Sequence, residues 1–232
     1  QKLIKKNFLV LAPTGIAAMN VGGQTIHSFF GLPFEAIGPK TIFEVSREKR
    51  DTLKYTDTII IDEASMVRSD WVDGIDRFLR SLMETHSPFG GKQVVFVGDL
   101  FQLPPVLKYG TADYELLCDM YGCGMPYFYK ANVMKRMNLP KIEFLKVYRQ
   151  RDSKFLEILN RMRVGENTGD DLSILNQHVS SDDKVGDYSV TLTAYLKMAD
   201  GINDKKLDDI ETEEFCYEGE VEGNFRMQDS PV

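Results

Sequence analysis

The chain has 232 residues, of which 43% are hydrophobic and 27% charged, and its formal net charge is −7. These values are typical of a globular protein with one large domain, or with one domain and part of another. No stretch approaches the roughly 18 uninterrupted apolar residues of a membrane-spanning helix, and the first residues lack a secretory signal, so we expect a protein of the cytoplasm, the bacterial nucleoid or the nucleus.

The distribution of charges and the spacing of the cysteines limit the possible ligands and metal sites further. Residues 130–163 hold ten Lys or Arg against three acids, whereas acids dominate from residue 166 onward. The negative total argues against a protein coated in nucleic acid, but the basic middle segment permits a local anion site. Cys118, Cys123 and Cys216 lack the paired spacing of zinc ligands, so we expect reduced thiols.

Short apolar runs alternate with helical patterns over the first 100 residues. Residues 8–12 form an apolar run closed by Pro13, and residues 58–61 form a second run. A helix is predicted from about Ser69 to the stop signal "SPFGG", because Trp71, Ile75, Phe78, Leu79 and Leu82 recur at three- and four-residue intervals. A third run, rich in valine, follows at 93–97. This alternation predicts an α/β fold with a parallel sheet covered by helices on both faces.

Each of the three apolar runs ends at polar residues. In a parallel sheet, ligands bind beyond the carboxyl ends of the strands. An unpaired buried carboxylate costs several kcal/mol, so adjacent acids after a strand belong at its wet end or beside a positive group. We therefore expect one rim of the sheet to carry Thr14, Asp62, Glu63, Asp99 and Gln102.

The second half of the chain is less regular. Its patterns predict a helix at "TADYELLCDM", a short strand at "MPYFYK", helices at "SKFLEILNRMRVGE" and "DLSILNQHV", and a new strand and helix within "YSVTLTAYLKMADGINDKKL". We place a domain boundary in the glycine- and acid-rich stretch. The predicted domains are residues 1–182 and 183–232.

The residues at the rim indicate nucleotide hydrolysis. In nucleotide hydrolases an Asp at a strand end holds Mg²⁺, usually through its water shell, and a neighbouring acid takes a proton from the attacking water. Asp62 and Glu63 fit these roles, Gln102 fits a phosphate-sensing amide, and Arg149 fits a guanidinium that neutralises developing charge. A solvated acidic turn is the alternative for the two acids alone.

Several segments resemble motifs of the petite-integration-frequency (PIF-type) DNA helicases, relatives of RecD in superfamily one. They are "LAPTGIAAMNVGGQTIHSFFGLP", "IIIDEASMV", "PFGGKQVVFVGDLFQLPPV" and "VYRQRD", and "DRFLRSLMETHSPFGGKQ" is similar to the signature that distinguishes the family. The resemblance covers nearly the whole chain. It implies two RecA-like domains that bind ATP and Mg²⁺ in their cleft and move 5′ to 3′ on single-stranded DNA.

The resemblance also assigns roles to individual residues. By this resemblance, Asp62 binds Mg²⁺ and Glu63 is the catalytic base. Gln102 senses the γ-phosphate, and Arg149 is the arginine finger. The segments that match the single-strand surface contain Pro13, Thr14, Gly15, His27, Ser28 and Phe29. The alternative role for Phe29 is core packing, and the alternative role for His27 is a local helix cap. The backbone amides at a strand-to-helix turn are suited to binding a phosphate.

The chain departs from the family pattern in three respects. The phosphate-binding pattern G-x-x-x-x-G-K-[ST] does not occur in it, and Leu196 stands where the family usually has asparagine, at a DNA-backbone contact. The later motifs of the second domain do not occur either. We therefore expect an internal piece of a monomeric helicase that alone neither binds ATP well nor hydrolyses it.

Two other functions stay open. One is a nucleic-acid-binding or interaction module with a relic ATPase face. The other is an ATPase that remodels proteins. The occurrence of "FQLPPV" together with "VYRQRD" argues against this second function.

Overall fold

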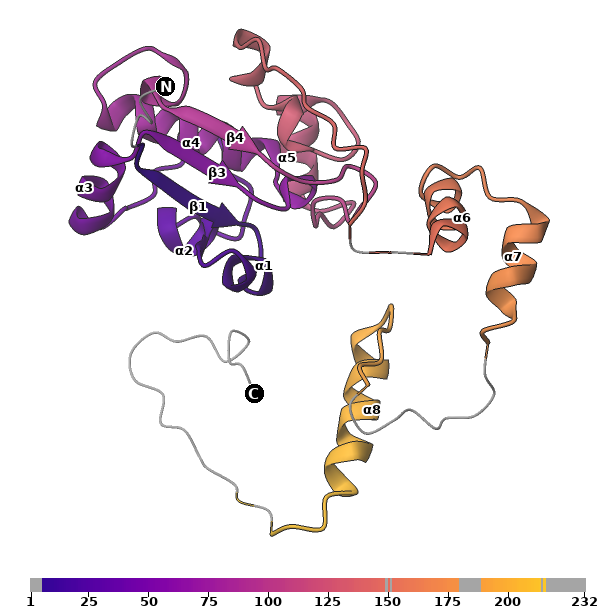
Figure 1. Ribbon diagram of the computed structural model, residues 1–232. Helices are drawn as coiled ribbons and strands as arrows, with labels where there is room; N and C mark the ends of the chain where they lie inside the picture. Colours follow the sequence, from indigo (N-terminus) through magenta and orange to yellow (C-terminus); the bar gives the residue numbers. More distant parts are fainter. Residues whose placement is uncertain (1–5, 149, 151, 180–188, 214, 216–232) are drawn as a thin grey trace. The chain divides into compact units, whose positions relative to one another are not determined.

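The computed structural model describes residues 6–148, 150, 152–179, 189–213 and 215 (Figure 1). The chain divides into two compact units, Gln1–Leu172 and Ser173–Val232. The predicted boundary between residues 182 and 183 lies outside the described residues and stays a prediction. None of the described helices is long and apolar enough to cross a membrane.

The first unit contains a four-stranded sheet in which every pairing is parallel. The spatial order is β2 (Gln24–Thr25), β1 (Phe8–Ala12), β3 (Thr58–Ile61) and β4 (Gln93–Phe96). Leu11 lies opposite Ile61, which lies opposite Phe96, so β1, β3 and β4 end level with one another. The predicted parallel α/β sheet is confirmed, and the polar residues after these three strands share one rim.

Helices and short 3₁₀ turns connect the strands and also follow the last strand, β4. The 3₁₀ turns are η1 (Ala64–Met66), η2 (Pro88–Gly91), η3 (Phe128–Lys130) and η4 (Met134–Arg136). The helices are α1 (Gly15–Asn20), α2 (Ile26–Phe30), α3 (Arg47–Tyr55), α4 (Ser69–Leu82), α5 (Ala112–Tyr121), α6 (Ser153–Arg163), α7 (Gly169–Asn176) and, in the second unit, α8 (Leu196–Asp208).

Helix α4 is central to the core. It begins at Ser69, as predicted, and its apolar stripe of Trp71, Ile75 and Leu79 is buried in one cluster with residues of β1 and β3. Three acids of α4 are buried as well, and each accepts hydrogen bonds from a different loop, which offsets their loss of hydration. The acids and their backbone donors are Asp70 with Ile37, Asp73 with Asn132 and Val133, and Asp76 with Phe89.

Two predicted strands are absent from the described residues. The segment predicted as a strand at "MPYFYK" forms η3, because its backbone bonds to the start of α4 instead of a sheet: Ser69 N donates to Pro126 O at 2.8 Å. Residues 189–195, predicted to begin a strand, are irregular up to α8, and no partner strand lies beside them among the described residues. An unpaired strand is not stable alone in water.

Candidate functional site

Asp62 and Glu63 lie at the carboxyl end of β3, where both are half-buried. The backbone N–H of Asp62 donates to Leu11 O of β1 at 2.9 Å. Glu63 adopts the left-handed conformation, with φ 47° and ψ 45°. Such a conformation costs a non-glycine residue about 1–3 kcal/mol and is concentrated at functional sites. The strand therefore turns sharply at its second acid and enters η1.

The end of β4 lies directly against this turn. Ala64 N donates to Val97 O at 2.9 Å, and a Cβ at Gly98 would lie 2.8 Å from Ala64 N. Real Cβ atoms do not approach a backbone nitrogen so closely, so position 98 requires glycine for steric reasons. The backbone that carries Glu63 is thus held between β1 on one side and β4 on the other.

Gly98→Ala is expected to lower the free energy of unfolding by about 1–3 kcal/mol, because the added methyl group displaces the Glu63–Ala64 backbone. Urea denaturation of the chain measures the change. Gly15→Ala is the matched control, since nothing lies within 4 Å of a Cβ built there. Equal stability of the two variants would contradict the steric account.

Gln102 follows β4, the strand next to β3, so it belongs to the same end of the sheet as Asp62. Its N–H donates to Asp99 O at 3.0 Å in a turn, and its side chain is exposed. The Asp99 carboxylate accepts hydrogen bonds from Phe101 N at 3.0 Å and from Arg163 at 3.1 Å. Arg149 lies outside the described residues, so its predicted place beside the acids stays a prediction.

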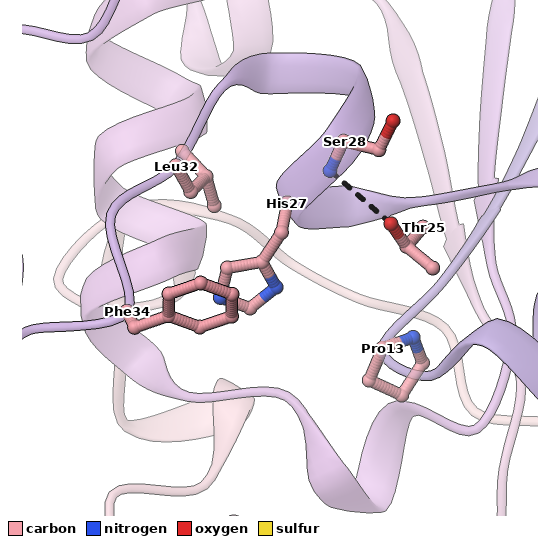
Figure 2. Close-up of a pocket in the computed structure, with 6 residues that line it drawn as sticks. All are labelled: Pro13, Thr25, His27, Ser28, Leu32 and Phe34. Carbon is pink, nitrogen blue, oxygen red and sulfur yellow. Dashed lines mark hydrogen bonds between the residues drawn. The ribbon is translucent and has the colours of Figure 1, made fainter. Parts of the chain in front are cut away.

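Three of the predicted single-strand contacts line one pocket. Pro13 follows β1, and His27 and Ser28 belong to α2, which follows the neighbouring strand β2 (Figure 2). The pocket has a volume of about 420 Å³, and its other lining residues are Thr25, Leu32 and Phe34. Sequence reasoning did not identify these three. Phe34 belongs to the apolar run "SFFGLPF", in which Phe29 and Phe30 are buried, and no pattern in the run separates the exposed ring from the buried ones.

The other predicted contacts lie in different surroundings. Thr14 caps α1 by accepting a hydrogen bond from Ala17 N at 3.3 Å, and Gly15 is the exposed first residue of that helix. Phe29 is 3% exposed and packs edge-on against Phe30, with ring centroids 5.2 Å apart. This burial favours the alternative of core packing for Phe29. Leu196 is the exposed first residue of α8.

His27 is held between two aromatic rings. Its ring stacks on Phe34, with centroids 5.3 Å apart and planes 20° apart, and meets Trp71 edge-on at 4.3 Å. Its Nε2 atom is buried and has no hydrogen-bond partner among the described residues. Burial lowers the pKa of His27, the nearby Arg68 lowers it further, and Asp70 opposes both. The helix cap of α2 is Thr25 rather than His27.

The lowered pKa of His27 makes stability depend on pH. Below the ordinary value of 6.5 the unfolded chain takes up a proton before the folded chain does, so stability present above pH 6.5 is lost as the pH falls. We expect His27→Gln to reduce this loss between pH 7.5 and about 5.5, measured by urea midpoints. His86→Gln, at an exposed position, is the control. If the pH dependence of stability were the same in the His27→Gln variant as in the unaltered chain, His27 would not be its source.

Cys118 and Cys123 are free thiols, and Cys216 lies outside the described residues. Within the described part of the chain, no group of three acidic, histidine or cysteine side chains is placed to hold a metal ion.

Several known proteins that resemble this chain are named ATP-dependent DNA helicases. ATP-dependent DNA helicase RRM3 of Saccharomyces cerevisiae is 36% identical over 172 residues, which are 72% of this chain and 22% of that protein. ATP-dependent DNA helicase Pif1 of Bdellovibrio bacteriovorus is 31% identical over 229 residues, which are 97% of this chain and 49% of that protein. The chain thus spans no more than about half the length of these relatives.

A solved structure extends the likeness to the fold. The crystal structure of Pif1 helicase from Bacteroides in complex with ADP-AlF3 and ssDNA superposes with a TM-score of 0.83 at 39% identity, covering 91% of this chain and 49% of that one. Residues 2–171 match the PIF1-like helicase family. With its parallel sheet and its strand-end acids in the arrangement described above, the chain belongs to the PIF1-like helicase family.

Proposed function

We propose that this chain forms part of an ATP-dependent DNA helicase that couples ATP hydrolysis to 5′-to-3′ movement on single-stranded DNA. The observation that carries the proposal is the turn at Glu63, which is held between β1 and β4 at the rim of a parallel sheet. Family membership supports it. ATP and single-stranded DNA are the proposed partners, and a monomer is the proposed active unit.

In this proposal the strand-end residues share the steps of hydrolysis. Glu63 takes a proton from the attacking water, and Gln102 hydrogen-bonds the terminal phosphate. Arg149 stabilises the charge that develops there. Because phosphoryl transfer depends mainly on positioning and charge stabilisation, a rigid backbone under Glu63 favours a constant distance between base and water.

Asp62 is the residue proposed to hold Mg²⁺. The ion binds hard oxygen donors, keeps several water molecules, and is usually held by one or two carboxylates together with substrate phosphates. A single half-buried carboxylate at a strand end fits that requirement. When bound, Mg²⁺ neutralises charge on the phosphates.

The pocket beside α2 is the proposed single-strand contact. Its lining combines an aromatic ring, a proline and a neutral imidazole with the hydroxyl side chains of Thr25 and Ser28. Such a surface suits stacking and hydrogen bonding to an unpaired base. Gly15, at the exposed turn that follows β1, is a further proposed contact of the single strand.

The test is unwinding by the complete protein that contains these residues. Duplexes with a 5′ or a 3′ single-stranded tail are compared, with and without ATP. We expect ATP-dependent strand separation from the 5′ tail only. Equal unwinding from the 3′ tail, or ATP hydrolysis that single-stranded DNA does not accelerate, would overturn the proposal.

A further inference from the structure

A buried ion pair between Arg68 and Asp70 lies at the start of α4. Arg68 is 4% exposed and Asp70 is 0% exposed. The guanidinium donates to both carboxylate oxygens, with Nε 2.9 Å from Oδ1 and Nη2 bonded to Oδ2. Buried ion pairs are weak evidence of stabilisation, because desolvation opposes the attraction between the charges. The groups that this pair holds in place therefore matter more than its own energy.

The pair binds the backbone of one loop at three points. Arg68 donates from Nη1 to Phe34 O at 3.3 Å and from Nη2 to Glu35 O at 3.1 Å. Asp70 accepts from Ile37 N at 2.8 Å. The backbone of residues 34–37 is thus held by the two side chains of this buried ion pair.

The anchored loop presents an aromatic ring to the pocket. Phe34 is 70% exposed, yet its ring stacks on His27 (Figure 2). On its other side His27 meets the edge of Trp71, and the Arg68 guanidinium lies 5.1 Å from the Trp71 ring centroid. Arg68 therefore contacts the residues on both sides of His27: it donates to the backbone of Phe34, and its guanidinium packs on the ring of Trp71.

We infer that Arg68 and Asp70 are positioning residues that fix Phe34 against His27, and that the Phe34 ring contacts an unpaired base of single-stranded DNA. This inference rests on the proposed function and deepens it. Base stacking on aromatic side chains tolerates any sequence, which suits a protein that moves along a strand. Arg68 is too buried, and its donors are too fully engaged, to bind phosphate itself.

The inference predicts that Phe34 and Arg68 act as one unit. In the complete protein we expect Phe34→Ala to weaken binding of a labelled oligothymidine by about 5- to 100-fold. Arg68→Lys keeps the charge but loses the forked geometry, so it is expected to weaken binding through the loop. The affinity of the double variant should lie within about twofold of that of Phe34→Ala, because the effects of substitutions at coupled residues do not add. Tyr55→Ala removes an exposed ring elsewhere and should have no effect.

The salt dependence separates positioning from direct contact. Losing a phosphate contact lowers the slope of log affinity against log salt by about 1, whereas losing a positioning residue leaves the slope unchanged. Unchanged affinity in a folded Arg68→Lys variant, losses that multiply in the double variant, or a reduced slope would each overturn the inference. If Arg68→Lys does not fold, Asp70→Asn is measured in its place under the same criteria.

A measurement without DNA separates this inference from the proposed function. Because the Phe34 ring stacks on His27, we expect it to shift the NMR resonances of the His27 ring protons, and we expect this shift to be lost in Phe34→Ala and diminished in Arg68→Lys. If the shift behaves so but the unaltered protein does not bind oligothymidine, the proposed function fails while the positioning role stands. If the shift is unaffected by Arg68→Lys, the positioning role fails whatever the DNA binding.

Discussion

Replacing Glu63 by glutamine in the complete protein is expected to lower the rate of ATP hydrolysis by about 10²- to 10⁴-fold, the usual contribution of a general base. Glutamine has nearly the same shape and keeps a hydrogen-bonding group, but it cannot take a proton from water. The backbone at residue 63 is held by the bond from Ala64 N to Val97 O, so the substituted side chain should occupy the same place.

The rate is measured at saturating ATP and oligothymidine, and the affinity for a fluorescent ADP analogue is measured in parallel. We expect unchanged nucleotide affinity, since the interaction lost belongs to the transition state. Glu44→Gln, at an exposed position in a loop, is the control and should hydrolyse ATP normally. A Glu63→Gln rate within about fivefold of the unaltered protein would show that another group is the base.

Replacing Asp73 by alanine is expected to lower the free energy of unfolding by about 3–5 kcal/mol. The Asp73 carboxylate is 6% exposed and accepts hydrogen bonds from Asn132 N and Val133 N, both at 2.9 Å, and from the Tyr121 hydroxyl at 3.0 Å. Burial and the adjacent Asp73 charge raise the pKa of Tyr121, so its hydroxyl stays a donor. Alanine leaves these donors buried without a partner.

Urea denaturation of the chain measures the loss, with Asp51→Ala as the control. The Asp51 side chain is 52% exposed and pairs with Lys54 at 3.7 Å, so its removal should change stability by no more than about 0.5 kcal/mol. Similar stability of the two variants would mean that the loop around residue 132 is not held by Asp73.

The sequence was sufficient to predict three strands of the parallel sheet, β1, β3 and β4, and the rim that carries the acids, whereas the two-residue strand β2 was not predicted. Apolar runs at 8–12, 58–61 and 93–97 are short for helices, the second and third are rich in β-branched residues, and their alternation with helical patterns permits few topologies. The start of α4 at Ser69 followed from the same patterns. Parallel pairing then places Asp62 and Glu63 at one edge without further information.

Features that depend on partners distant in sequence were not predictable. The donors to Asp73 lie 48 to 60 residues further along the chain, so nothing near it shows why an acid is buried there. The same holds for Phe34, whose backbone carbonyl accepts a hydrogen bond from Arg68, more than 30 residues further along the chain. The segment at η3 has the composition of a strand, but the carbonyl group of Pro126, just before η3, accepts a hydrogen bond from Ser69 N at the start of α4.

The most direct test of the central claim, that the strand-end acids hydrolyse ATP under the control of single-stranded DNA, is a paired ATPase assay. The 232-residue chain, which contains no G-x-x-x-x-G-K-[ST] pattern, is compared with the complete protein, each with and without oligothymidine. In the proposed mechanism Glu63 would activate water only when the phosphates are held a few ångströms away. We predict DNA-stimulated hydrolysis in the complete protein alone, lost on Glu63→Gln; robust turnover by the 232-residue chain that survives Glu63→Gln would contradict the account.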